Sequence, residues 1–303
     1  MCGMPSLPSL DAEEGIAFLT RPAPQAKAAR MASAAKLERQ ARKEGGIAET
    51  TRFLLFLFVF TLLLRTFIVA PFMIPSGSML PGLAIGDYLF VEKWPYGYSR
   101  FAFPFGLAHF EGRLWGADPR RGDVVIFHHP SKDEDWVKRL IGLPGDRVQM
   151  RGGQLFLNGR AVPKVRIADY LMARTPNSPC RYVGNYQPRP VAEGDSRFCP
   201  YPRFRETLPN GRSYEILDQI DGIADNTPVY TVPKGHYFMM GDNRDDSADS
   251  RFSIEEQGVG FLPSENVIGR PMIVFFSTDG SAEWLKPWTW FSALRWRRVG
   301  TTF

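Results

Sequence analysis

A serine held between two prolines is the first position whose residue type and setting could do covalent chemistry. Residues 75–81 read PSGSMLP, and Ser78 follows a glycine within them. The prolines restrict the backbone on both sides, which presents a hydroxyl on a rigid turn, as nucleophile turns often do. An ordinary Ser/Gly/Pro loop has the same composition, so this stretch alone leaves both interpretations open.

A lysine within an apolar strand pattern could supply the base for such a nucleophile. In the sequence WVKRLI at 136–141, strand alternation places Lys138 on one face with Trp136 and Leu140. An ammonium among apolar neighbours is disfavoured, so its pKa falls, and the adjacent Arg139 would add repulsion between like charges. A lysine that acts as a base near pH 8 needs its pKa lowered by about two units from about 10.4. Such a shift means that the environment disfavours the charged form by roughly 3 kcal/mol. The alternative is a lysine at a strand edge whose ammonium reaches water.

A polar run, GDNRDDSADSR at 241–251, is the third candidate. Its acidic spacing resembles a calcium loop, but Arg244 occupies a would-be ligand position and no glycine stands at the sixth place. A hydrogen-bonded polar turn fits better. In such a turn Asp249 and Arg251 could form an ion pair, and Ser247 could orient another group.

Neither histidine nor cysteine spacing predicts a metal site. The 4 histidines lie outside any recognisable metal-binding or Ser-His-Asp pattern, and 3 cysteines are too few for a zinc ribbon or a disulfide scaffold. We therefore expect neither a metal nor a cofactor.

An apolar run before these motifs is expected to anchor them at a membrane, and the alternative is a buried core helix. Residues 53–70 would span about 27 Å as a helix, close to a hydrocarbon core of about 30 Å, and 53–64 carry no charge. Residues 21–52 carry a net charge of +5, so the positive-inside rule places the N-terminus in the cytoplasm. We expect a single anchor over 51–71, with everything after it outside the cytoplasm.

Composition excludes other classes of protein. With 44% hydrophobic residues in 303, a disordered or collagen-like chain is excluded. The whole-chain charge of +5 hides −3 in residues 1–20 and +5 in residues 21–52. The charge is therefore a signal of topology and not of nucleic-acid binding. Residues 1–50 are expected to be a solvated cytoplasmic tail, with a basic surface helix over 27–43 as the alternative.

The rest of the chain predicts a mainly β fold. Short apolar runs between Pro-Gly and Gly-Asp turns indicate antiparallel strands at 88–92, 123–128, 136–141, 147–150, 154–157 and 236–240. We expect a β-barrel-like catalytic domain over 72–159 and 233–282. Residues 160–232, richer in arginine, proline and polar residues, are expected to form a smaller and less regular inserted subdomain.

Taken together, the segments resemble bacterial type I signal peptidase, or leader peptidase, a family of proteases with a Ser-Lys dyad. The matching pieces are RTF at 65–67, PFMIPSGSMLP at 71–81, GDY at 86–88, KRLIGLPGD at 138–146, GDNRDDSADSR at 241–251, FLP at 261–263 and VIGR at 267–270. The resemblance runs from about residue 49 to residue 276, and the inserted segment carries little of it.

The resemblance implies a site in which a neutral lysine activates a serine. Ser78 matches the nucleophile and Lys138 the general base, and the resemblance implies an acyl-enzyme in which the substrate is esterified to Ser78. The remaining matches are the Ser76 hydroxyl and Ser78 amide as the oxyanion hole, Ser247 as the residue that orients the lysine, and Asp249 with Arg251 as the brace of that loop.

The resemblance also implies the substrates and partners. Family members cut signal peptides from secreted preproteins after Ala-x-Ala-like sites, at the outer, periplasmic face of the inner (cytoplasmic) membrane. Expected partners are those signal peptides, the phospholipid bilayer and the secretion translocon, and no nucleic acid. By motif position, shallow pockets for small side chains would be lined by Phe72, Ile74, Met79, Leu83, Trp136 and Val137, although some of these could be core residues.

Two features follow from the expected topology. Cys180 and Cys199 both lie outside the cytoplasm, where a disulfide between them is chemically allowed. Residues 283–303 are rich in tryptophan and arginine, including Trp284, Trp288 and Trp296. Aromatic side chains beside arginine suit a membrane–water interface, and the alternative is that they cap the β core.

Two rival functions stay open. A LexA-type self-cleaving repressor also uses a Ser-Lys dyad on a related β fold, but it should be soluble and begin with a DNA-binding helix-turn-helix. A membrane-tethered, β-rich interaction protein without activity would not need both Ser78 and Lys138.

Overall fold

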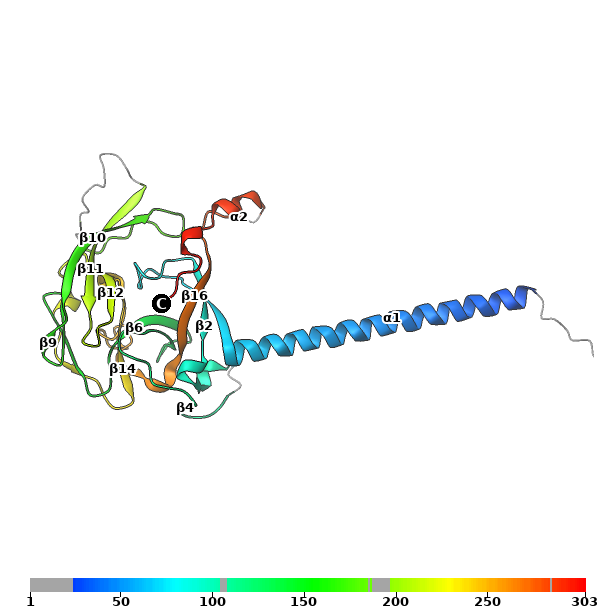
Figure 1. Cartoon of the computed structure of the whole chain (residues 1–303), viewed down its shortest axis with the longest axis horizontal. Helices are drawn as coiled ribbons and strands as arrows, with labels where there is room; N and C mark the ends of the chain where they lie inside the picture. Colours follow the sequence, from blue (N-terminus) through cyan, green and yellow to red (C-terminus); the bar gives the residue numbers. More distant parts are fainter. Residues whose placement is uncertain (1–23, 104–107, 185, 187–196, 284) are drawn as a thin grey trace, which may run out of the picture. The chain divides into compact units, whose positions relative to one another are not determined.

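The computed structural model describes residues 24–103, 108–184, 186, 197–283 and 285–303 (Figure 1). The chain forms two compact units, Met1–Val59 and Phe60–Phe303. Helix α1 covers Pro24–Leu63 and passes through a π-helical turn, Leu64–Ile68, into strand β1, Val69–Met73.

The apolar part of this helix is long enough to cross a membrane. Gly46–Ile68 qualifies by length and composition, and none of its most apolar stretch is buried, which argues against a core helix. The helix ends at Ile68, three residues before the end of the anchor expected over 51–71.

Residues 24–50, which were expected to be a solvated tail or to contain a basic surface helix over 27–43, are helical. This segment is rich in alanine, lysine, arginine, glutamine and glutamate, the residues that favour helix most, and proline at the first helical position is well tolerated. Residues 1–23 lie outside the described part of the chain.

The mainly β fold with antiparallel pairing is confirmed in the unit Phe60–Phe303. Its largest sheet has seven strands in the order β1-β2-β16-β5-β6-β14-β15. The bounds are Asp87–Glu92 for β2, Val267–Ser277 for β16, Val124–His128 for β5, Asp135–Gly142 for β6, His236–Met240 for β14 and Leu262–Pro263 for β15. All six strands expected from the sequence are present, four of them in this sheet.

Three smaller sheets complete the unit. One contains β13 (Tyr230–Thr231), β7 (Arg147–Arg151), β8 (Gln154–Leu157) and β9 (Arg160–Ala161). Another contains β10 (Lys164–Ala173), β11 (Phe198–Thr207) and β12 (Ser213–Leu217), and a two-stranded one pairs β3 (Tyr98–Ser99) with β4 (Arg113–Leu114). The described helical turns are α2 (Trp288–Ser292) and 3₁₀ turns at Trp94–Tyr96, Arg100–Ala102, Ile223–Asp225, Arg244–Asp246, Ser264–Asn266 and Trp296–Arg298.

The inserted segment is more regular than expected. β10 and β11 are ten residues long each and pair antiparallel. Of β10 only Met172 is buried, so the strand lacks the alternation of apolar and polar residues by which a sequence reveals a half-buried strand.

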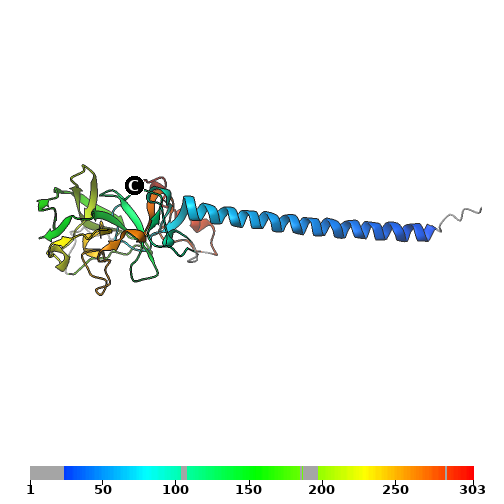
Figure 2. The same ribbon diagram turned by 90° about the horizontal axis from the view of Figure 1, so that it is seen from below.

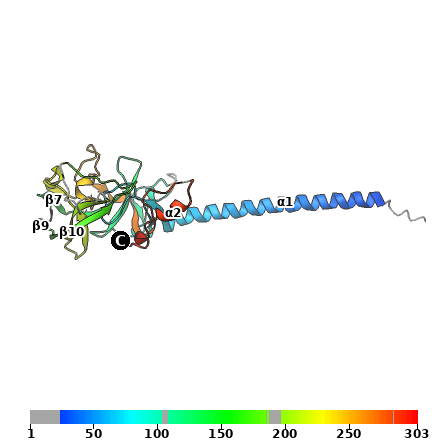
Figure 3. The ribbon, with the colours of Figure 1, turned by 90° about the horizontal axis from the view of Figure 1, so that it is seen from above.

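Strands β9 and β10 and the C-terminal helix α2 lie at opposite ends of the β unit (Figures 1 and 3). Figure 2 shows the same separation, with the green and yellow strands at one end and the red C-terminal segment at the other.

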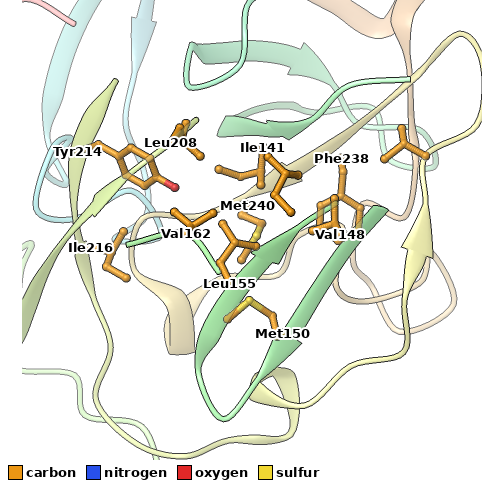
Figure 4. Packing of buried hydrophobic residues seen from close by; sticks show 12 residues of the cluster. Ile141, Val148, Met150, Leu155, Val162, Leu208, Tyr214, Ile216, Phe238 and Met240 are labelled. Atoms are coloured by element: carbon orange, nitrogen blue, oxygen red, sulfur yellow. The ribbon is translucent and has the colours of Figure 1, made fainter. Parts of the chain in front are cut away.

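A shared core joins the inserted segment to the large sheet (Figure 4). Ile216 of β12 belongs to the same buried cluster as Val148 of β7, Leu155 of β8 and both Phe238 and Met240 of β14. Full burial of each such side chain contributes about 1.5–3 kcal/mol. The insert is thereby held against β14, the strand that leads into the polar loop 241–251.

The C-terminal segment returns to the large sheet. Thr278 bridges Leu294, and Ile273 bridges Thr302. Trp288 and Trp296 are exposed, as are Trp290 and Phe291 of α2, whereas Trp284 lies outside the described residues. The interfacial role of these tryptophans stays a prediction.

Candidate active site

The turn that carries Ser78 connects β1 to β2. The amide of Ile74 donates to the Asp87 carbonyl, and the Gly86 amide donates to the Ile74 carbonyl, so the two ends of the connection are joined. Within it, Leu83 donates its amide to the Met79 carbonyl at 2.9 Å. The side chains of Met79 and Leu83 are buried, which anchors the turn and leaves Ser78 beside β6.

Lys138 reaches Ser78 from the middle of β6. Its Nζ lies 2.6 Å from Ser78 Oγ, and the two side chains are separated by 60 positions in the sequence. The Nζ also lies 5.4 Å from the centre of the Trp136 ring, as expected for two residues on one strand face. Lys138 is 4% exposed, so its amine meets the serine hydroxyl away from bulk water.

Burial lowers the pKa of Lys138 to about 8. The nearby Asp249 carboxylate opposes this effect, and the Arg251 guanidinium adds to it. The expectation that Arg139 supplies the like charge is wrong. Arg139 points away, donating to both carboxylate oxygens of Asp242 at 2.7 Å, because neighbouring residues of a strand face opposite sides.

The polar loop is organised around Asp249. Its carboxylate accepts hydrogen bonds from Ser247 Oγ, the Gly241 amide and Arg251 Nε, each at 2.9 Å. Burial alone would raise the pKa of Asp249, but Arg251, the Gly241 amide and Lys138 together outweigh burial, and the pKa lies below its ordinary value. Ser247 is thus fixed by Asp249, and within the described residues no hydrogen bond joins it to Lys138.

Two residues that sequence reasoning did not single out also hold the nucleophile turn. The backbone N–H of Asn243 donates to the Ser78 carbonyl at 3.0 Å, and its side-chain Nδ2 donates to the Gly77 carbonyl at 3.1 Å. Gly241 leaves space for this contact, because a methyl group there would lie 2.2 Å from Ser247 Oγ and 2.7 Å from the Ser78 carbonyl oxygen. Both belong to the polar run, but the sequence does not indicate which segment the run contacts.

A second brace comes from the C-terminal segment. Asp87 is fully buried and accepts hydrogen bonds from the Ala84 amide and from Arg298. Arg298 Nη2 also donates to the Gly82 carbonyl at 2.8 Å. The chain after residue 283 therefore supports the end of the turn that follows Ser78, and no sequence signal pointed to this contact.

A cavity of about 600 Å³ opens beside Ser78 and Lys138. Of the expected pocket residues, Phe72, Trp136 and Val137 line it, whereas Ile74, Met79 and Leu83 belong to the buried core that Phe72 borders. The lining that the sequence did not suggest consists of Met73, Pro75, Gly77, Glu134, Asp135, Arg181, Asp246 and Ala248.

Two residues that line this cavity each carry a hydrogen-bond donor with no protein acceptor within the described ranges. Ser76 is exposed and lines the cavity, as does Ser78. Over the described ranges, neither the Ser76 hydroxyl nor the Ser78 amide makes a hydrogen bond. Hydrogen-bond donors that have no protein acceptor can stabilise a negatively charged oxygen of a bound substrate.

Cys180 and Cys199 are joined by a disulfide, with their Cα atoms 5.4 Å apart. This separation is within the usual range for such a bond. The bridge ties the segment after β10 to the start of β11. Cys2 lies outside the described residues.

Known proteins are similar to this chain over most of its length. The family described as signal peptidase, peptidase S26, matches residues 47–276. Signal peptidase I of Rickettsia canadensis (strain McKiel) is 36% identical over 233 residues, covering 74% of this chain and 77% of the relative. The Rickettsia typhi enzyme of the same name is also 36% identical, covering 74% and 78%. A crystal structure of a signal peptidase I from Enterococcus faecalis V583 is 27% identical, with a TM-score of 0.27, and covers 51% of this chain and 97% of that one.

Proposed function

The chain belongs to the signal peptidase family, peptidase S26, and we propose that it removes signal peptides from exported preproteins with Ser78 as nucleophile and Lys138 as base. The observation that carries the proposal is the 2.6 Å contact between Ser78 Oγ and a buried lysine amine. A pKa of about 8 leaves a substantial neutral fraction of Lys138 near that pH, and only the neutral amine can accept a proton.

The reaction proceeds in two steps. Neutral Lys138 takes the Ser78 proton as Oγ attacks the scissile carbonyl, and the resulting ammonium gives that proton to the leaving amine. The signal peptide is then an ester on Ser78. Lys138, neutral again, takes a proton from the water that attacks the ester. The resulting ammonium gives that proton to Ser78 Oγ as the ester bond breaks, which releases the signal peptide and restores the Ser78 hydroxyl and neutral Lys138.

The two unpartnered donors would hold the oxyanion of both steps. The Ser78 amide and the Ser76 hydroxyl lie at the cavity, where they cost no reorganisation when negative charge develops on the carbonyl oxygen. Removal of one oxyanion donor typically lowers kcat by about 10²–10³-fold. Ser76→Ala should therefore reduce kcat, with the Ser78 amide still present.

Apolar walls favour small side chains next to the scissile bond. Phe72, Trp136 and Val137 line the cavity beside the dyad, and bulky walls leave room for alanine-sized groups. This supports cleavage after Ala-x-Ala-like sites. Ser247 would act indirectly, through Asp249, on the charge around Lys138.

Membrane anchoring would bring the enzyme to its substrates. The net charge of +5 on residues 21–52 favours a cytoplasmic N-terminus and a catalytic unit outside the cytoplasmic membrane. Exposed Trp288, Trp290 and Phe291 on α2 support contact of that unit with the bilayer surface. The secretion translocon is a further expected partner.

Cleavage of a preprotein in detergent tests the proposal. Wild type should release the mature protein, while Ser78→Ala and Lys138→Ala should reduce the rate by at least about 10³-fold. Ser281→Ala and Lys234→Ala make the same substitutions at exposed positions and should cleave like wild type. Full activity of either dyad variant would refute the assignment, and inactivity of the wild type would favour the interaction-protein alternative.

A further inference from the structure

Three aspartates from separate segments converge outside the catalytic cavity. Asp218 follows β12, Asp225 ends the 3₁₀ turn Ile223–Asp225, and Asp245 lies in the 3₁₀ turn Arg244–Asp246. One carboxylate oxygen from each lies within 4.8 Å of the other two. The cluster thus joins the inserted segment to the polar loop.

Asp225 has a buried oxygen with no partner. Its side chain belongs to a residue that is 1% exposed, and Oδ2 accepts the Gly222 amide at 2.6 Å. Oδ1 has no hydrogen bond within the described part of the chain. A methyl group built on Gly153 would lie 3.3 Å from Asp218 Oδ2, 3.5 Å from Lys164 Nζ and 3.6 Å from Asp225 Oδ1, so both oxygens and the ammonium lie around the same point. An unpaired carboxylate oxygen in the interior is costly and calls for a ligand.

The charges of the cluster do not balance. Lys164 pairs with Asp218 and also donates to the Gly153 carbonyl. Asp245 Oδ2 accepts only neutral backbone amides, those of Gln219 and Ile220. Three carboxylates and one ammonium leave two negative charges.

Other groups near the cluster do not remove this excess. Arg251, which also acts on Asp225, is paired with Asp249. Burial and the Asp218 carboxylate raise the pKa of Asp225, and they raise the pKa of Asp245 to about 6. Burial is the larger cause of both shifts, and the neighbouring carboxylates add to it.

We propose that Asp218, Asp225 and Asp245 bind one divalent cation that prefers oxygen ligands, such as Ca²⁺ or Mg²⁺. A divalent cation neutralises the two excess charges and provides the missing partner for Asp225 Oδ1. Carboxylate oxygens are the ligands that these cations prefer, and the cluster contains no sulfur or imidazole that would select a softer metal. Water molecules would complete the coordination.

The bound cation would link two parts of the fold. Asp245 stands two residues before Ser247, and Asp218 and Asp225 belong to the insert. The cation therefore holds the polar loop against the insert and takes no part in bond cleavage. Binding is measured without substrate, so the inference stands or fails independently of the proposed function.

Calorimetric titration of the full chain tests the site. The protein, in an uncharged detergent and stripped with chelator, is titrated with CaCl₂ and separately with MgCl₂. Wild type should bind one equivalent of at least one of the two, with a Kd no weaker than about 10⁻³ M. At ten times the Kd the thermal unfolding midpoint should rise by about 3–6 °C.

A matched pair of variants distinguishes cation binding at this site from nonspecific binding to surface charge. Asp225→Asn should weaken binding at least about tenfold, because it removes the charge of the unpaired carboxylate. Asp221→Asn makes the same change at an exposed position of the same loop and should bind like wild type. No saturable binding by wild type up to about 10 mM, or equal weakening in both variants, would overturn the proposal.

Lys164→Gln provides the second variant should Asp225→Asn fail to fold. Removal of the ammonium from Asp218 takes away a charge that competes with the cation. Binding should therefore tighten by about tenfold or more, since one positive charge near a buried site contributes at least about that factor. Unchanged or weaker binding would overturn the proposal.

Discussion

The pH dependence of cleavage should report the titration of Lys138. Its pKa of about 8 lies below the ordinary value of 10.5. A difference of about 2.5 pH units corresponds to roughly 3.4 kcal/mol between the charged and neutral forms. Since only the neutral amine accepts the Ser78 proton, about half of the enzyme should be competent at pH 8, about a tenth at pH 7 and about a hundredth at pH 6.

The assay is kcat/KM for an internally quenched peptide with an Ala-x-Ala site, measured from pH 6 to pH 10.5 in detergent. The rate should rise about tenfold per pH unit below pH 7.5 and reach a plateau above about pH 9. Circular dichroism at each pH controls for unfolding. A rate that continues to rise to pH 10.5, or that does not change between pH 6 and pH 9, would refute the reasoning that a buried lysine is the base.

Three further predictions concern the groups that hold the site. Lys138→Met should raise the free energy of unfolding at pH 7 by up to about 3 kcal/mol, because the unfolded lysine binds its proton more tightly than the folded one. This gain should disappear above pH 10.5, where lysine is neutral in both states, and denaturant titration at both pH values checks it. Arg298→Ala should lower the free energy of unfolding by about 3 kcal/mol, by leaving Asp87 buried with a weaker partner, and should lower kcat more than it changes KM. Arg298→Lys, which keeps the charge, should recover part of both. Reduction of the Cys180–Cys199 disulfide should increase the intact mass of the protein by two hydrogen atoms, and an unchanged mass would contradict the bridge.

Local sequence patterns predicted those parts of the site whose conformation is set by residues next to each other in the sequence. Proline and glycine around Ser78 indicate a turn, and the apolar alternation around Lys138 indicates a strand face, because both signals act over a few residues. The structure brings these two side chains together across 60 positions. That pairing could be expected only from the family resemblance, since strand order is set by long-range packing.

Contacts between distant segments could not be predicted from the sequence. Arg298 reaches Asp87 over 211 positions, and Asn243 reaches Gly77 over 166. Each depends on the path of the backbone, which no local pattern encodes. Composition was also ambiguous for the helix before the anchor, because alanine and charged residues suit both a solvated tail and a helix.

The most direct test of the Ser78–Lys138 dyad is to identify the covalent intermediate. A reaction of enzyme and substrate peptide at pH 8 is quenched in acid within milliseconds to seconds and mapped by mass spectrometry. The account predicts that the signal-peptide fragment is esterified to Ser78, and that the adduct is missing from Lys138→Ala. An adduct on a different residue, or its formation at the wild-type rate in Lys138→Ala, would contradict the account.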